Sequence, residues 1–233
     1  MPVNPFLPTA ARAGSAPALA RILPFAAYLF FLFAADMLAR LDVEAQQLRW
    51  LYPCKIGAVL ALLLFFRRSY PELAWRGMRP RLAALAVAAG LLVFALWISL
   101  DAGWMKLGSS PGFDPGDGAG GIDWTLAALR IGGAMLVVPV MEELFWRSFL
   151  LRWMASPDFQ AVNPRQVGYR AFVVTVLLFG FEHDLWLAGI VAGAVYSLLY
   201  MRGGNLWAAI LAHGVTNGVL GIWIVATGNW NYW

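Results

Sequence analysis

The residues of this sequence that can do chemistry are a few acids, two histidines and an amide, all in its second half. Glu142 and Glu143 are adjacent, the two histidines are His183 and His213, and Asn217 follows His213 by four residues. A carboxylate and an imidazole together can take a proton from water. A second imidazole and an amide can donate hydrogen bonds to the oxyanion that forms when this water attacks a carbonyl. These groups suffice to hydrolyse an amide without a covalent intermediate.

The same side chains also suit a metal-centred reaction. Glu142, His183 and His213 would supply three ligands to zinc and leave a fourth position for water. The His-Glu-x-x-His pattern of the soluble zinc proteases is absent. A reaction that needs no cofactor and a zinc-dependent reaction therefore both stay open.

The elements that must position these residues are predicted to be membrane helices. Of the 233 residues, 61% are hydrophobic and 13% are charged, about half the roughly 25% of charged residues in a soluble domain. The composition excludes disordered and fibrous proteins and is not that of a soluble one. A single cysteine, Cys54, excludes an intramolecular disulfide.

Seven apolar segments have lengths near those that cross a bilayer. We place them at residues 22–39, 50–66, 82–100, 124–151, 171–186, 187–201 and 206–226. The sequence therefore predicts an all-α, polytopic transmembrane bundle of about seven spans, with six to eight as the range. The fifth and sixth spans are short and nearly contiguous, so either a tight turn around Trp186 to Gly189 or one re-entrant element fits this part of the sequence.

Basic residues indicate the orientation, because Lys and Arg in short loops stay on the cytoplasmic side. Loops assigned to the outside contain only Arg40, Arg49 and Lys106. Loops assigned to the inside contain Arg12, Arg21, Arg67, Arg68, Arg76, Arg79, Arg81, Arg152, Arg165, Arg170 and Arg202. The N-terminus is expected in the cytoplasm, and the composition suggests a bacterial inner membrane. We expect the lipid bilayer and no nucleic acid as partners.

Ionisable side chains inside spans cost several kcal/mol unless they are paired or face water. Glu143 and Arg147 stand four residues apart on one predicted helix, so they can form an ion pair. Glu142 is rotated by about 100° from Glu143 and has no second cation in reach along the sequence. The helical rise puts Glu142, His183 and His213, all predicted inside spans, at similar depth. The three groups can therefore meet in one cavity.

A purely structural interpretation competes with this chemistry. Glu142 and Glu143 can both neutralise Arg147 and lock helices together. A histidine inside a membrane often serves only as a hydrogen bonder between helices. Pro139, which has no N–H, is expected to kink the span just before the acids.

Three short motifs, in this order on successive predicted helices, resemble those of a known family. Residues 142–147 match EExxxR, residues 179–183 match FxxxH, and residues 213–217 match HxxxN. The combination resembles the CAAX protease and bacteriocin-processing (CPBP, or Abi) family of intramembrane endopeptidases, in its bacterial branch related to CAAX prenyl proteases. The resemblance covers residues 124–217.

The resemblance implies a domain organisation and a role for each motif residue. The chain would be a single integral membrane domain, residues 1–233, with N-terminal spans in 1–123 and a catalytic core in 124–217. Glu142 and His183 would activate the attacking water, and His213 and Asn217 would form the oxyanion site. The supporting residues would be Glu143, Arg147 and Phe179.

The resulting hypothesis is an intramembrane endopeptidase that cleaves a hydrophobic or lipid-modified peptide. Family members have been regarded both as metalloproteases and as glutamate-dependent enzymes, so zinc stays possible. A second hypothesis is a non-catalytic membrane scaffold or bacteriocin-immunity protein of the same fold. A third, a proton-coupled transporter, is disfavoured because the sequence has no internal repeat.

Overall fold

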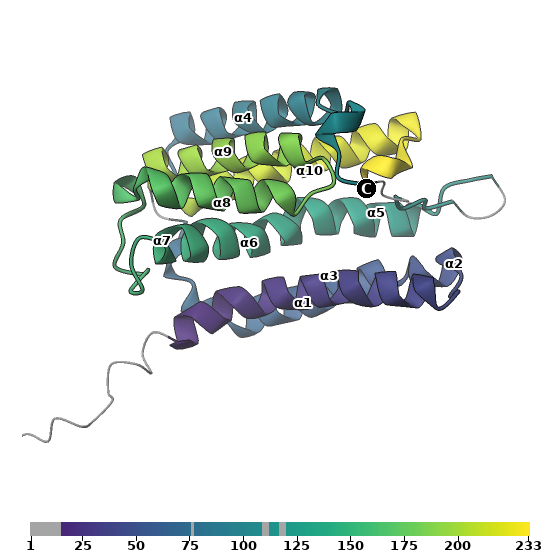
Figure 1. The fold of residues 1–233 in the computed structure, drawn as a ribbon, viewed down its shortest axis with the longest axis horizontal. Helices are drawn as coiled ribbons and strands as arrows, with labels where there is room; N and C mark the ends of the chain where they lie inside the picture. Colours follow the sequence, from purple (N-terminus) through teal and green to yellow (C-terminus); the bar gives the residue numbers. More distant parts are fainter. Residues whose placement is uncertain (1–14, 76, 109–111, 117–119) are drawn as a thin grey trace, which may run out of the picture.

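The protein is a bundle of long helices that run in similar directions (Figure 1). This computed structural model describes residues 15–75, 77–108, 112–116 and 120–233. Within these residues no strand occurs, apart from one isolated bridge between Gly116 and Ile122. Arg12 and Arg76, which entered the orientation argument, lie outside the described residues.

Seven helical segments correspond to the seven predicted spans. They are α1 (Ser15–Arg40), α3 (Leu51–Phe65), α4 (Pro80–Ser99), the continuous run from α5 (Trp124–Gly132) to α7 (Leu151–Trp153), α8 (Tyr169–Phe181), α9 (Trp186–Gly203) and α10 (Leu206–Thr227). Five of them are long and apolar enough to cross a membrane, while α3 and α8 are apolar but shorter. The predicted all-α bundle of about seven spans is confirmed.

Short helical turns fill the connections. They are α2 (Ala45–Leu48), η1 (Arg67–Ser69), η2 (Pro71–Leu73), η3 (Gly103–Met105), η6 (Pro164–Gln166) and η7 (Trp230–Tyr232). Local chemistry sets the ends of the long helices. Asp123 accepts hydrogen bonds from two amides at the start of α5. Gly204 and Gly228 end α9 and α10 in the left-handed conformation that glycine adopts readily.

The central helical run separates two groups of helices. In Figure 1, α1 and α3 lie together on one side of the α5 to α7 run, and α4, α8, α9 and α10 lie on the other. Of the helices able to cross a membrane, α10 is the most buried and α1 the least. Helix α10 contacts α4, α9 and the central run. Side chains of α10 therefore connect α4 and α9 to the central helical run.

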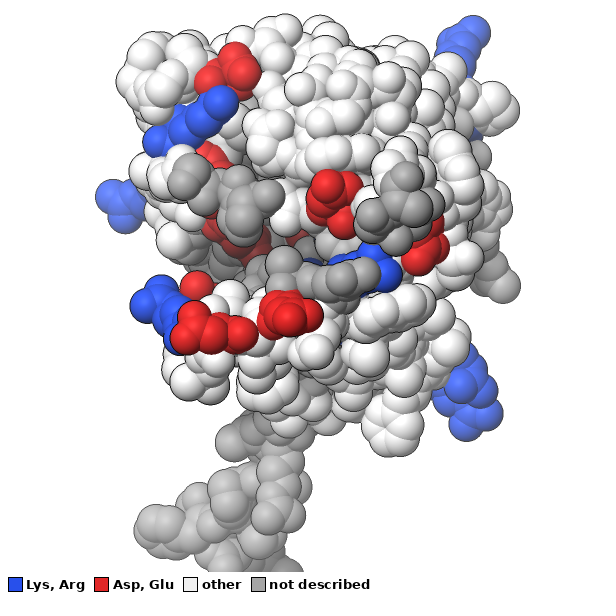
Figure 2. Space-filling view, turned by 90° about the vertical axis from the view of Figure 1, so that its right-hand side faces the viewer, with Lys and Arg blue, Asp and Glu red and all other residues white. Residues whose placement is uncertain are grey.

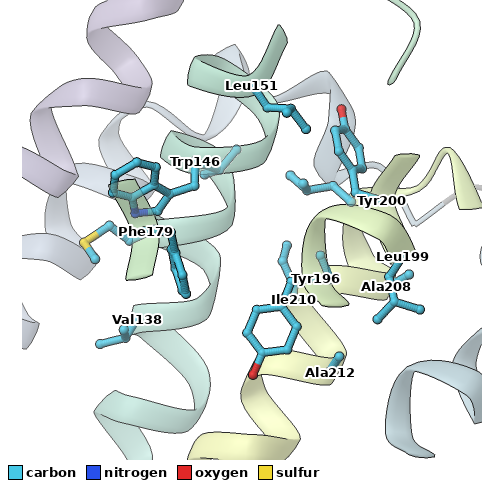
Figure 3. Close-up of a cluster of buried hydrophobic side chains, with 14 of the residues drawn as sticks. Val138, Trp146, Leu151, Phe179, Tyr196, Leu199, Tyr200, Ala208, Ile210 and Ala212 are labelled. Carbon is cyan, nitrogen blue, oxygen red and sulfur yellow. The ribbon is translucent and has the colours of Figure 1, made fainter. Parts of the chain in front are cut away.

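The core around α10 combines aromatic and small residues. Figure 3 shows Trp146, Phe179 and Tyr196, from three helical segments, in one core cluster with Ala208 and Ala212 of α10. Small residues let the backbones approach, as in many membrane helix contacts. At the crossing of α4 and α10, a Cβ on Gly90 would collide with the carbonyl oxygen of Ala212.

The break between the fifth and sixth spans differs from the prediction. Helix α8 ends at Phe181 and α9 begins at Trp186, so His183 lies in the turn between two helices and not inside a span. Hydropathy placed the turn at residues 186–189, but Gly189 lies inside α9, where a Cβ would come within 3.0 Å of the Gly180 backbone. The backbone turns instead at the consecutive polar residues 182–184.

Candidate active site

The helical run that carries the acids is not a regular α-helix. Two wider π-helical stretches, η4 (Gly133–Val137) and η5 (Leu144–Leu150), flank α6 (Val138–Glu143). Such i to i+5 stretches are rare and are frequent at functional sites. The sequence predicted a kink at Pro139, and the π-helical stretch η4 comes just before this proline.

The proline explains the position of Asn217. The Val138 N–H donates to the Gly133 carbonyl, five residues back, and the next residue, Pro139, has no N–H to offer. The Ala134 carbonyl instead accepts a hydrogen bond of 2.9 Å from Nδ2 of Asn217 on α10. One N–H of the Asn217 amide is therefore committed to holding α10 against η4.

Glu143 and Arg147 form the ion pair that their spacing predicts. Both side chains are fully buried, and Nη1 of Arg147 lies 3.0 Å from Oε1 of Glu143. Nη2 of Arg147 donates to the Gly193 carbonyl on α9 at 3.3 Å. The guanidinium also lies 4.2 Å from the centroid of the Phe179 ring. The pair thus joins the central run to α8 and α9.

Glu143 also orients one of the histidines. Nδ1 of His213 lies 3.0 Å from Oε1 of Glu143, so Nδ1 carries the proton that is donated to the carboxylate. The other ring nitrogen, Nε2, lies 4.0 Å from Oε2 of Glu142. Because Nδ1 is protonated, Nε2 accepts a hydrogen bond in the neutral ring and donates one only in the imidazolium form.

The four residues predicted to be catalytic line one cavity of about 170 Å³. They are Glu142, His183, His213 and Asn217, and Phe179 of the supporting set lines it with them. Oε2 of Glu142 is buried and has no hydrogen-bond partner among the described residues. A buried carboxylate oxygen without a partner is costly. A water molecule or a substrate group in the cavity would supply the missing hydrogen bond.

His183 is held by the main chain and not by an acid. Its Nδ1 lies 2.8 Å from the Phe179 carbonyl, and Trp97 of α4 packs edge-on against the ring with centroids 5.3 Å apart. A carbonyl only accepts hydrogen bonds, so Nδ1 carries a proton and Nε2 of the neutral ring is left as an acceptor. No hydrogen bond joins His183 to Glu142 within the described part of the chain, so a water molecule between them would have to connect the two.

Sequence reasoning missed several side chains around these residues. Tyr196 of α9 stacks on the His213 ring, with centroids 4.9 Å apart, and its hydroxyl donates to Thr216 at 2.8 Å. Nε1 of Trp146 donates to Glu182 at 3.1 Å. An aromatic residue in an apolar span has the same appearance whether it faces lipid or an imidazole, so no sequence signal distinguished these residues.

The cavity extends towards the end of the bundle that carries the C-terminus, because Tyr232 and Trp233 line it. The Tyr232 hydroxyl donates to Asp101 at 2.8 Å. Burial, followed by this hydrogen bond and the charge of Asp101, raises the pKa of Tyr232 to about 12. Figure 2 looks onto this end of the molecule and shows a hollow with acidic side chains around it.

Glu142, His183 and His213 are also the three residues that the sequence offers as zinc ligands. Among the residues that the structure describes, no three His, Cys, Asp or Glu side chains form a group that could hold a metal ion. Nδ1 of His213 is engaged with Glu143, and Nδ1 of His183 with a carbonyl. These bonds leave Nε2 of each ring as its acceptor, but Glu142, His183 and His213 do not come together as a three-ligand group in this arrangement.

Comparison with known proteins adds the family. Residues 123–219 match a family model described as Rce1-like, Type II CAAX prenyl endopeptidase Rce1-like. No curated protein and no solved structure matches the chain significantly. The matched segment contains all three motifs, and two further helices able to cross a membrane, α1 and α4, precede it. The chain is thus an integral membrane protein, and its residues 123–219 match the family model of Rce1-like type II CAAX prenyl endopeptidases.

Proposed function

We propose that this protein is an intramembrane endopeptidase that hydrolyses a peptide bond in a hydrophobic or lipid-modified peptide. The family match supports a CAAX-type endopeptidase. The observation that carries the proposal is the buried, unpartnered carboxylate oxygen of Glu142 in a cavity that two imidazoles and an amide also line. Apolar helices surround this cavity, as a substrate with a hydrophobic or lipid group requires.

The proposed reaction begins with a water molecule between Glu142 and His183. Glu142 takes a proton from this water while Nε2 of His183 accepts its second hydrogen bond, and the water oxygen attacks the peptide carbonyl. The carbonyl oxygen becomes an oxyanion. When the tetrahedral intermediate collapses, the C–N bond breaks and the proton held by Glu142 passes to the leaving amine. The products are a new carboxyl group and a new amino group.

His213 and Asn217 are proposed to stabilise the oxyanion. His213 can donate from Nε2 only when its ring is protonated, because Nδ1 already donates to Glu143. Asn217 has a second N–H in addition to the one that it donates to Ala134. Each residue therefore donates one hydrogen bond within the protein and is proposed to donate a second one to the oxyanion.

The setting is proposed from the distribution of basic residues. The N-terminus would lie in the cytoplasm, the membrane would be a bacterial inner membrane, and the peptide would enter from the bilayer or from the cytoplasmic side. The proposed reaction uses no metal, since the described side chains around Glu142 do not form a three-ligand group.

A non-catalytic scaffold is the second candidate. The observation that favours it is that Glu143, Arg147 and His213 satisfy one another, and that Asn217 bonds a backbone carbonyl. These contacts would hold the helices together whether or not water is activated. Only Glu142 lacks such a structural explanation, so it distinguishes the two candidates.

The test is cleavage by the purified, detergent-solubilised protein of a library of prenylated and unmodified hydrophobic peptides. Glu142→Gln is expected to lower the cleavage rate by about 100-fold or more, because it removes the general base. Glu44→Gln, at an exposed position in a connection, is the matched control and should cleave as the wild type does. Cleavage that survives in Glu142→Gln would leave the scaffold as the better explanation of these residues.

Chelation tests the absence of a metal step. Cleavage by the wild-type protein is expected to be unchanged by a chelator, since no step uses a metal. Loss of cleavage on chelation, with recovery on addition of zinc, would contradict the metal-free reaction. That result would require Glu142, His183 and His213 to rearrange into ligands.

A further inference from the structure

One cation that lines the same cavity has no acidic partner among the residues that the structure describes. Arg130 lies in α5, and of the described residues that line the cavity it is the one Lys or Arg. Every ion pair within the described part of the chain involves other cations, and no Asp or Glu pairs with Arg130. A charged side chain on a membrane helix normally pairs or faces water. A ligand that enters the cavity could therefore supply the acidic partner of Arg130.

Aromatic rings hold the guanidinium of Arg130. Its Cζ lies 4.2 Å from the ring centroid of Tyr52 on α3, 5.6 Å from that of Phe113 and 5.9 Å from that of Trp233. Rings attract a cation through their faces. Nε of Arg130 is buried and has no hydrogen-bond partner in the described residues.

The ligand that suits such a group is a carboxylate. A guanidinium presents its N–H groups in a planar fork that matches the two oxygens of a carboxylate. Arg130 is also partly buried, and a charged hydrogen bond is stronger where water is scarcer. We propose that Arg130 binds the C-terminal carboxylate of the peptide substrate. This assignment rests on the endopeptidase function proposed above.

The spacing along the helical run fits cleavage close to the peptide's C-terminus. Arg130 and Glu142 are twelve residues apart, which is roughly 18 Å at 1.5 Å per residue. An extended peptide covers at most about 3.3–3.6 Å per residue, so three residues beyond the attacked carbonyl cover roughly 10 Å. The two long side chains can span much of the remaining distance. The carboxylate on Arg130 would thus fix which peptide bond reaches Glu142.

Binding to the Glu142→Gln protein tests this assignment without any cleavage. The probe is a fluorescent peptide that ends in a farnesylated cysteine and three aliphatic residues, made with a free carboxylate and with a carboxamide. We expect the carboxylate peptide to bind about tenfold more tightly or better, as for a charged hydrogen bond. Adding Arg130→Gln should abolish this preference. Arg130→Lys should retain part of it, because the charge stays but the planar fork is lost.

Arg49→Gln is the matched control, because Arg49 also lies near this end of the bundle, bonded to the Gly116 carbonyl, but does not line the cavity. It should keep the full preference. Equal binding of the two peptides, or binding of neither, would overturn the assignment. A further probe is a carboxamide peptide whose last residue is Glu. If it binds as tightly as the peptide with a free C-terminal carboxylate, the assignment is also overturned, because a side-chain carboxylate would then serve as well as the C-terminal one.

The two proposals can fail separately. Loss of the carboxylate preference with intact, Glu142-dependent cleavage would remove Arg130 from substrate binding and leave the endopeptidase in place. A carboxylate preference that depends on Arg130, in a protein whose wild type cleaves no peptide, would leave a peptide-binding protein without the reaction.

Discussion

At the scale of single residues, Glu143 holds one arginine and one histidine at once. It pairs with Arg147 and with Nδ1 of His213 through the same carboxylate oxygen. Glu142 next to it keeps a free oxygen in the cavity. The adjacent acids thus divide two tasks, one holding charged neighbours and the other facing the reactants. The roughly 100° between consecutive helical residues makes this division possible.

Removing the charge of Glu143 should lower the stability of the folded protein, because Glu143 neutralises a buried arginine. Glu143→Gln leaves Arg147 buried without a counter-charge, and breaking a buried pair from one side costs about 3–5 kcal/mol. We expect a loss of that order in the free energy of unfolding, measured in detergent. The double variant Glu143→Gln with Arg147→Met should recover a large part of it, because neither charge then remains unpaired. An unchanged loss in the double variant would contradict the pairing.

The motif residues could be found from the sequence because each motif is local. The ion pair of Glu143 and Arg147 needs only a four-residue spacing. The contact of Glu143 with His213 joins residues 70 positions apart, and no spacing rule predicts it. Arg130 could be seen in the sequence only as a charge inside the span predicted at residues 124–151, since its aromatic neighbours come from α3, the 101–123 connection and the C-terminus.

At the scale of helices, the sequence predicted which segments are helical but not how they deviate from regular geometry. The seven spans follow from hydrophobic length, and they agree with the structure to within a few residues at most ends. The π-helical stretches around α6 and the turn at His183 depend on packing that hydropathy does not record. Pro139 predicted an irregularity at the right place, and the π-helical stretch shows the form that the irregularity takes.

The hydrogen bond from Asn217 to Ala134 should contribute more to the stability of the folded protein when Pro139 is present than when it is replaced. Asn217→Ala removes a donor to a buried carbonyl, and we expect a loss of about 1–3 kcal/mol in the free energy of unfolding. Pro139→Ala returns an N–H to the central run, so Asn217→Ala should cost less in that background. A double-mutant cycle in detergent measures this difference. If the losses in the free energy of unfolding from Asn217→Ala and Pro139→Ala simply add, the two residues are independent and the explanation is wrong.

The contact between α4 and α10 depends on Gly90. Gly90→Ala would put a Cβ against the Ala212 carbonyl oxygen, and overpacking of this kind costs about 1–3 kcal/mol. A lower thermal unfolding temperature in detergent is expected. Gly57→Ala in α3 is the control, because no atom lies within 4 Å of the added Cβ and alanine is the better helix former. Similar effects of the two substitutions would refute the close contact as the cause.

At the scale of the whole molecule, a buried polar network joins the helices at one end of the bundle. Arg21 of α1 bonds Glu72 in the connection before α4, and Ser148 of the central run bonds the same carboxylate. Arg152 and Phe159 complete the cluster around Arg21 and Glu72. This network fastens α1 to the rest of the bundle at the end that the basic residues assign to the cytoplasm. The opposite end carries the hollow and the acidic side chains of Figure 2.

Labelling of introduced cysteines in intact cells would establish which end faces the cytoplasm. With Cys54→Ser as background, Lys106→Cys should react with a membrane-impermeant thiol reagent, and Arg202→Cys should react only after the membrane is permeabilised. The reason is that most loop Arg residues lie at the Arg202 end, as the positive-inside rule requires. The reverse labelling pattern would invert the orientation. Arg130 would then lie nearer the cytoplasm than Glu142, and a peptide would enter the cavity past the arginine with its carboxylate last.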